Sequence, residues 1–108
     1  MAFEHYILME ILAHRAYSDL YYDVNFWRTK SGLEVDFILG GGEVAIEVKG
    51  SSRVDSAELR PLARFIEDYK PAKSIVVCNE KSPRKHENIQ IIPWRRFLKM
   101  LWNGEIMT

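Results

Sequence analysis

The sequence has only one cysteine in 108 residues, and its charges cancel, since 15 lysine and arginine residues balance 15 aspartate and glutamate residues. The single cysteine, Cys78, excludes a disulfide framework within the chain and is typical of a reducing cytosol. A free-standing DNA-binding domain is usually basic overall. Any contact with nucleic acid must therefore come from local patches of charge rather than from the chain as a whole.

Several other signals are absent from the sequence. No apolar run reaches the ~20 residues that span a bilayer, and no basic region followed by an apolar core marks a signal peptide. The glycines at 40–42 lack the lysine and the following helix of a phosphate-binding loop, and no group of cysteines and histidines suggests zinc. We expect a cytoplasmic protein with no membrane partner. The length and the lack of repeats or linkers predict one domain over residues 1–108.

The most informative stretch covers residues 32–50 and reads GLEVDFILGGGEVAIEVKG. Apolar and polar residues alternate on both sides of the glycines, which predicts two strands joined by a turn. Successive side chains of a strand point to opposite faces. One face of the hairpin is therefore expected to carry the apolar residues Val35, Phe37, Leu39, Val44, Ile46 and Val48. The other face carries Asp36 on the first strand and Glu47 and Lys49 on the second.

The register of this hairpin can be counted from the turn. If residues 40–43 form a four-residue loop, Leu39 faces Val44, Asp36 lies opposite Glu47, and Glu34 lies opposite Lys49. Like charges in directly opposed positions destabilise a strand pair, so Asp36 and Glu47 need a cation nearby. Lys49 is one candidate, and Mg²⁺, which prefers carboxylate oxygens, is another. The alternative is a hairpin whose polar face simply meets solvent.

These residues resemble a known signature. Asp36, a glycine turn and then Glu47-Val48-Lys49 are similar to the D…(D/E)-x-K pattern of the PD-(D/E)XK nuclease superfamily. Residues 26–51, FWRTKSGLEVDFILGGGEVAIEVKGS, resemble more specifically the C-terminal domain of a group of prokaryotic AAA-type ATPases. The resemblance is weak after Lys70, and Val35 stands where the superfamily pattern has proline.

The resemblance implies a restriction-endonuclease-like fold and a metal-dependent DNA endonuclease that hydrolyses phosphodiester bonds. Asp36 and Glu47 would bind Mg²⁺ or Mn²⁺, with the carbonyl of Val48 and the carboxylate of Glu10 as further ligands. The metal would polarise the scissile phosphate and activate the attacking water. Lys49 would orient that water or stabilise the negative charge that develops on the phosphate.

The first helix is predicted over residues 3–17, which contain neither glycine nor proline. Glu10 lies in the middle of a largely apolar arc of this helix, and a buried carboxylate needs a partner. The alternative to a metal is a structural pairing of Glu10 with His14, one turn along the helix, or with Lys49. We expect His14 to be a structural neighbour rather than a ligand.

The remaining pattern predicts an α/β fold with a mixed sheet. A strand at 21–29 precedes the hairpin and completes a three-stranded antiparallel meander. A crossover helix then leads to a buried strand at 73–79, which is expected to lie parallel to the strand of Glu47. One further strand at 89–92 and a C-terminal helix at 93–102 end the fold, so one or two strands follow the crossover helix.

The crossover helix itself has a clear start and one conflict. Asp55 and Glu58 have the spacing of a capping box, and the helix is expected to run to about Tyr69. Pro61 lies inside this range, where an interior proline costs about 3 kcal/mol. We therefore expect a kink or an irregular first turn at Pro61.

Cationic residues outside the hairpin are the candidates for contact with nucleic acid, and solvated loop charge is the alternative. The six candidates are Arg53, Lys81, Arg84, Lys85, Arg95 and Arg96. The resemblance also implies an ATPase domain in a longer parent chain. The domain could then be a catalytically silent nucleic-acid-binding or regulatory module, or a purely structural α/β domain. A homodimer is left open as an assembly.

Overall fold

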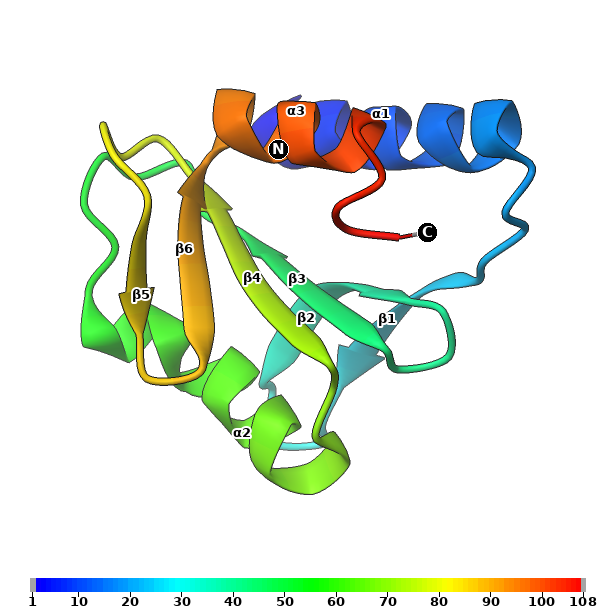
Figure 1. Cartoon of the computed structure of the whole chain (residues 1–108). Coiled ribbons are helices and arrows are strands. Elements are labelled where there is room, and N and C mark those ends of the chain that lie inside the picture. The colour runs from blue at the N-terminus through cyan, green and yellow to red at the C-terminus, as the bar shows by residue number, and fades with distance from the viewer. Residues whose placement is uncertain (1, 108) are drawn as a thin grey trace.

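The computed structural model describes residues 2–107 and has a six-stranded sheet between helices (Figure 1). Helices α1 and α3 cover one face of the sheet, and α2 covers the other. Within residues 2–107, no helix has the length and apolar character needed to cross a membrane. The elements in chain order are α1 (Ala2–Ser18), β1 (Val24–Arg28), β2 (Glu34–Leu39), β3 (Val44–Val48), the 3₁₀ turn η1 (Ser56–Leu59), α2 (Arg60–Tyr69), β4 (Lys73–Cys78), β5 (Arg84–His86), β6 (Ile89–Pro93) and α3 (Trp94–Trp102).

The strand order is β1-β2-β3-β4-β6-β5. The predicted antiparallel meander of β1, β2 and β3 is confirmed, and so is the parallel pairing of β4 with β3 after a crossover helix. Three strands follow the crossover rather than one or two, because β5 pairs antiparallel with β6 at the sheet edge. The three residues of β5, Arg-Lys-His, have no apolar pattern, which an edge strand can lack because one of its sides faces solvent.

Each face of the sheet has its own hydrophobic core. The core under α1 and α3 includes Ile7, Ile46 and Phe97, and the core under α2 includes Leu62 and Val76. Cys78 is fully buried in the second of these cores, as its position in an apolar strand predicted. The parallel strands β3 and β4 are buried along almost their whole length, which is typical of strands covered on both faces.

One irregularity interrupts strand β2 near its middle. Asn25 of β1 pairs with Ile38 of β2. Trp27, two residues later, pairs with Val35, so β2 has one extra residue between these pairs. Val35 and Ile38 consequently lie in the core under α2, while Phe37 lies in the opposite core. The strict alternation expected for this strand is wrong here, and such a β-bulge bends the strand and re-aims a side chain.

Helix α1 buries a stripe that contains Ile7, Ile11 and His14. Tyr6 and Tyr17 are 45% and 83% exposed, although the sequence places both on the same largely apolar arc as Glu10. Apolar residues surround much of this helix, so its rotation is set by the sheet and by α3, against which it packs, rather than by a single stripe in the sequence.

The capping box before α2 is confirmed. The backbone N–H of Glu58 donates to the side chain of Asp55 over 2.9 Å, and the backbone N–H of Asp55 donates to the side chain of Glu58 over 3.1 Å. The conflict at Pro61 is resolved by the 3₁₀ turn η1, after which α2 starts at Arg60. Pro61 thus lies in the first turn of α2, where its missing N–H has no helical partner to lose.

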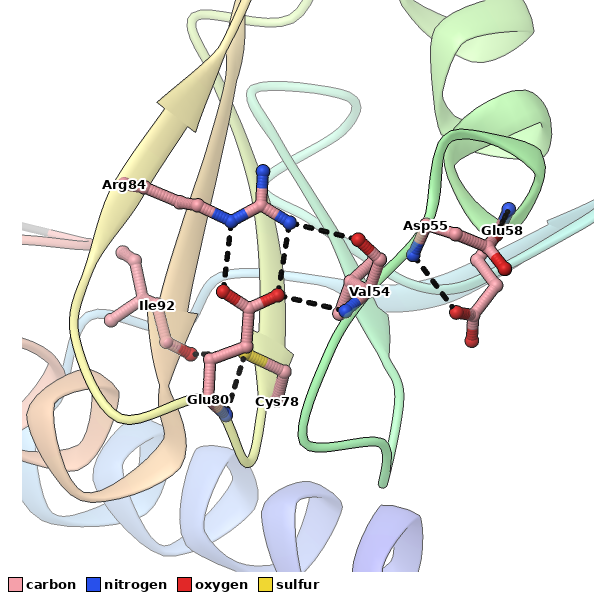
Figure 2. Close-up of polar contacts among 7 residues, drawn as sticks. All are labelled: Val54, Asp55, Glu58, Cys78, Glu80, Arg84 and Ile92. Carbon is pink, nitrogen blue, oxygen red and sulfur yellow. Dashed lines mark hydrogen bonds and ion pairs between the residues drawn. The ribbon is translucent and has the colours of Figure 1, made fainter.

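A buried ion pair ties the segment after β3 to the start of β5 (Figure 2). The guanidinium of Arg84 donates to both carboxylate oxygens of Glu80, over 2.8 and 2.9 Å. The same two side chains bind the backbone of Val54, whose N–H donates to Glu80 and whose carbonyl accepts from Arg84. The hydrogen bonds from Arg84 lower the pKa of Glu80 to about 2. This arrangement fixes the loop that follows Lys49.

We predict that Arg84→Met lowers the free energy of unfolding by about 3 kcal/mol at pH 7, because it leaves the Glu80 carboxylate buried without its partner. The pKa of Glu80 is lower in the folded state, so its contribution is present above pH 4.5 and is lost as the pH falls toward 2. Urea unfolding of both proteins should therefore show a difference that shrinks below pH 4.5. Lys85→Met, at an exposed neighbouring position, is the control and should change stability by less than about 0.5 kcal/mol.

Candidate active site

Two reciprocal hydrogen bonds join the carboxylates of the central hairpin to its backbone. The N–H of Asp36 donates to Oε1 of Glu47 over 3.2 Å, and the N–H of Val48 donates to Oδ2 of Asp36 over 2.7 Å. The predicted register is confirmed, because Leu39 pairs with Val44 and the next positions bring Asp36 to Glu47. Each carboxylate therefore reaches from its own strand to the backbone of the other strand.

These side-chain bonds begin where the ladder between β2 and β3 ends. Phe37 with Ile46 is the last ladder pair on this side. Beyond it β3 stays beside β4, where the N–H of Lys49 donates to a β4 carbonyl over 2.9 Å. Glu34, predicted opposite Lys49, instead forms an ion pair with Arg28 of β1 at 2.7 Å. The two strands separate at Asp36, and the carboxylates bridge the opening between them.

Glu47 is the most strongly perturbed group of the site. It is only 2% exposed. Burial is the main cause that raises its pKa, to about 9, and the neighbouring carboxylate of Asp36 adds to this effect. Lys49 lowers the pKa of Glu47 only in part, since its Nζ lies 4.0 Å from Oε2 of Glu47. Burial and the nearby Asp36 carboxylate thus favour the protonated form of Glu47 by raising its pKa.

Lys49 lies at the boundary between the buried carboxylate of Glu47 and solvent. Its side chain is 31% exposed, whereas that of Glu47 is 3% exposed. A lysine ammonium is a compact charge on a flexible stem, so Lys49 can shift between Glu47 and a group that approaches from solvent. The structure thus brings together Asp36, Glu47 and Lys49, and Val48 joins them through its backbone N–H.

Helix α1 contributes Glu4 to this neighbourhood rather than the predicted Glu10. Glu4 and Asp36 line one shallow pocket of about 240 Å³. The pKa of Glu4 is raised, first by partial burial and then by the charge of Asp36. Glu10, about 9 Å further along the helix at 1.5 Å per residue, accepts a hydrogen bond from the indole N–H of Trp102 over 3.1 Å. The geometry therefore favours Glu4 as the carboxylate that α1 brings to the site.

His14 has a structural role, as expected. Its Nδ1 lies 3.0 Å from the hydroxyl oxygen of Tyr22, and that hydroxyl donates to the carbonyl of Ile11 over 3.1 Å. Because the one hydroxyl proton is used in this bond, Nδ1–H of His14 is the donor to Tyr22. Burial lowers the pKa of His14, so the ring is neutral and joins α1 to the segment before β1.

The donor set at the hairpin suits a hard divalent cation. Asp36 keeps Oδ1 and Glu47 keeps Oε2 beyond the bonds to the backbone. Within residues 2–107, no group of three or more His, Cys, Asp or Glu side chains is placed to hold a metal ion. Mg²⁺ is commonly bound by one or two carboxylates together with water and substrate phosphates. Two carboxylates alone would therefore supply only part of the ligand set of such an ion.

The six cations predicted to contact nucleic acid fall into different surroundings. Arg84 is held in the buried ion pair with Glu80. Arg53 and Lys85 are exposed, on the segment after β3 and on β5. The other three line one pocket of about 440 Å³ together with a fourth cation that was not predicted, and these four residues are Lys81, Arg95, Arg96 and Lys99.

Two residues that sequence reasoning missed carry a recognisable signal. Glu4 precedes Ile7 and Ile11 at the i+3 and i+7 spacing of one helix face, so it extends the buried stripe of α1 to its first turn. Lys99 follows Arg95 by four residues, which places both side chains on the same face of α3. For both Glu4 and Lys99 the helical spacing can be read from the sequence. Which face of the helix lies at the site or the pocket is determined by tertiary packing.

The sheet, the bridging carboxylates and the adjacent lysine define an α/β domain with an acidic candidate site at the point where two central strands separate. The sequence matches, over residues 1–97, the family described as Domain of unknown function (DUF4143), a domain found with AAA-type ATPases. The chain belongs to this family. No curated protein and no solved structure matches the chain.

We predict that Glu47→Gln stabilises the metal-free protein at neutral pH, because it removes a buried acid whose pKa is raised to about 9. A raised folded-state pKa gives a contribution that is present below pH 4.5 and is lost as the pH rises toward 9. The stability gain of the variant should therefore grow from about zero at pH 4.5 to the order of a few kcal/mol at pH 8.

Urea unfolding in the presence of a chelator measures this difference. Glu67→Gln, at an exposed position of α2, is the control and should leave stability unchanged at every pH. A Glu47→Gln variant that is less stable than the wild type at pH 8 would show that the ionised carboxylate is required by the fold.

Proposed function

We propose that the chain is a PD-(D/E)XK nuclease-like domain that hydrolyses phosphodiester bonds of DNA with Mg²⁺ or Mn²⁺. The observation that carries this proposal is the meeting of Asp36 and Glu47 across separating strands, with Lys49 4.0 Å from Glu47. The D…E-x-K residues that were counted along the sequence thus belong to one site. An acidic pair beside a lysine is the residue set that this chemistry uses.

The chain's own residues would have distinct roles. Asp36 and Glu47 would hold the metal, which when bound polarises the phosphate and makes water a better nucleophile. Lys49, at the solvent boundary, would hold the attacking water or the negative charge that develops on the phosphate. The hydrogen bonds from the N–H groups of Asp36 and Val48 orient the two carboxylates and leave Oδ1 and Oε2 for binding.

Glu4, rather than Glu10, is proposed as the α1 carboxylate that neighbours Asp36, outside the pair formed by Asp36 and Glu47, because no three such side chains of residues 2–107 are placed to hold one ion. Its pocket is shared with Asp36, and the charge of Asp36 contributes to its raised pKa. A cation between Glu4 and Asp36 would remove the repulsion that raises this pKa. Glu10, in contrast, is held by Trp102.

A second function, a catalytically silent nucleic-acid-binding or regulatory module associated with an ATPase, is favoured by one observation. Asp36 and Glu47 both serve as acceptors for backbone N–H groups that the β2–β3 ladder leaves free. The pair thus has a structural use that does not require a metal. The two proposals differ in whether these carboxylates bind a cation and in whether DNA is cut.

We predict that millimolar Mn²⁺ raises the thermal midpoint of the wild type. A ligand at ten times its dissociation constant adds about 1.4 kcal/mol, or roughly 5 °C for a domain of this size. Asp36→Asn should abolish the shift, and Glu4→Gln should reduce it. Glu10→Gln, on the same helix, is the matched control and should keep the full shift. If the thermal midpoints of the wild type and of Asp36→Asn rise equally, Mn²⁺ does not bind at Asp36 and the proposed metal site is wrong.

We predict that Lys49→Ala loses metal-dependent DNA cleavage by a factor of about 100 or more, because charge stabilisation of this kind contributes about 3 kcal/mol. The same variant should keep most of its Mn²⁺-induced thermal shift, since Lys49 is not a metal ligand. Cleavage is measured on single-stranded, duplex and branched DNA with Mg²⁺ and with Mn²⁺, with and without ATP. A wild type that binds Mn²⁺ but cuts none of these substrates would favour the silent module.

A further inference from the structure

A pocket with uncompensated positive charge lies beside the candidate site. The loop after β4 supplies Lys81, and α3 supplies Arg95, Arg96 and Lys99. All four side chains are exposed. Among the ion pairs of residues 2–107, none involves any of these four cations. Glu80 also lines the pocket, but its charge is balanced by Arg84.

The sheet register places this pocket at the same edge as Lys49. Val48 pairs with Val77 of β4, and Val77 pairs with Ile92 of β6. Lys49 directly follows β3 and Pro93 is the last residue of β6, so their backbones lie at about one level, two strand spacings apart. At about 4.8 Å for each spacing, this separation is about 10 Å. Figure 1 shows that β4 and β6 end at the edge where α3 begins.

A second set of contacts connects the pocket with the carboxylates. The ring of Trp94, which lines the pocket, has edge contacts with Phe3 and Tyr6 of α1 at centroid distances of 6.4 and 5.9 Å. Glu4 lies between these two residues in the sequence and lines a pocket with Asp36. The first turn of α1 therefore contacts the basic pocket through Phe3 and Tyr6 and also contributes Glu4 beside Asp36.

The pocket is held in place by contacts behind it. The guanidinium of Arg95 lies 4.7 Å from the ring centroid of Trp94, and cation–π stacking of this kind restricts an arginine. The N–H of Asn79 donates to the carbonyl of Ser51 over 3.1 Å. Glu80, which directly precedes Lys81, is bound to Val54. The loop with Lys81 is thus fastened to the segment that follows Lys49.

We propose that this pocket binds a phosphate of the same nucleic-acid strand whose phosphodiester is held at Asp36, Glu47 and Lys49. This inference rests on the proposed function. The backbone separation of about 10 Å is short enough for one strand to reach both places, since such a strand carries a phosphate for every 3.4 Å along the helix axis. The substrate strand would run along the carboxyl ends of β3, β4 and β6. Arginine forks suit phosphate oxygens because they can donate two hydrogen bonds to one phosphate.

A neutral chain can bind a polyanion in this way because its charges are segregated at one edge. The acidic pair would take a cation, and the four pocket cations would take the flanking phosphate. A nucleic-acid strand carries a phosphate at every nucleotide, so it can supply one phosphate to the pocket and another to a cation at Asp36 and Glu47, whereas the spacing of carboxylates in an acidic protein segment depends on its sequence. The arrangement therefore favours a nucleic acid over an acidic protein as the occupant.

The test measures DNA binding without cleavage, by fluorescence anisotropy of a labelled 20-mer, single-stranded and duplex, in a chelator. Arg95→Gln/Arg96→Gln should weaken binding at least tenfold at 100 mM salt. It should also reduce the slope of log K against log salt by about 2 for the duplex, since each phosphate contact contributes about 0.9. Lys30→Gln/Arg60→Gln removes two exposed charges elsewhere and should change neither quantity as much.

The outcomes separate this inference from the proposed function. The phosphate-binding pocket would be excluded if the wild type bound no DNA at low salt. It would also be excluded if the Arg95/Arg96 variant bound DNA as tightly as the Lys30/Arg60 control. Neither result would affect the tests of metal binding and cleavage. If the wild type binds DNA through the pocket but cuts no DNA, the proposed nuclease function is wrong. The proposed position of a scissile phosphate at Asp36, Glu47 and Lys49 is then wrong as well. Polyglutamate that competes for the pocket as strongly as DNA, at equal charge, would assign it to an acidic protein instead.

Discussion

The structure depends on how two backbone N–H groups find partners where β2 and β3 separate. A buried backbone donor without a partner costs as much as a lost hydrogen bond, and the ladder no longer serves Asp36 and Val48 at this point. The carboxylates of Glu47 and Asp36 accept from these donors. The same bonds force two acids together in a buried place, which is why the pKa of Glu47 is raised so far. The carboxylates of Asp36 and Glu47 thus both connect the two strands and form the candidate site.

The separation of these strands also decides what surrounds the site. Once β2 diverges, β3 pairs with β4, and the carboxyl ends of β3, β4 and β6 share one edge of the sheet. The bulge in β2 sends Val35 and Phe37 to opposite cores, so both helical layers stay packed across the irregularity. The first turn of α1 then closes over the opening and brings Glu4 to it. Strand order, together with helices α1 and α3, thus places an acidic site and a basic pocket close to one edge of the sheet.

The features that the sequence predicted correctly are those set by local chemistry. The glycine turn fixed the hairpin register, because a three-glycine loop can take the positive φ angles found at Gly40, Gly41 and Gly42. The capping box and the parallel β4 followed from spacing and from an apolar run. The bulge, the rotation of α1 and the pairing of β5 depend on tertiary contacts, so Glu4 was missed in favour of Glu10. The ion pair of the half-buried Arg84 with Glu80 was also not predicted, because nothing near Arg84 in the sequence distinguishes it from Lys85.

The hydrogen bonds that Asp36 and Glu47 accept from the backbone do not require these two side chains to be acids. A carboxamide at position 36 or 47 offers the same oxygen to a backbone N–H and avoids the like-charge repulsion. The chain nevertheless places two acids there, which raises the pKa of Glu47. At the same edge, four cations have no ion-pair partner among residues 2–107. Natural proteins usually depart from local stability rules at functional sites. In a chain with no net charge, two opposite departures at one edge argue that these charges are there for an external partner that carries charge of both signs, such as a metal ion on a phosphate backbone.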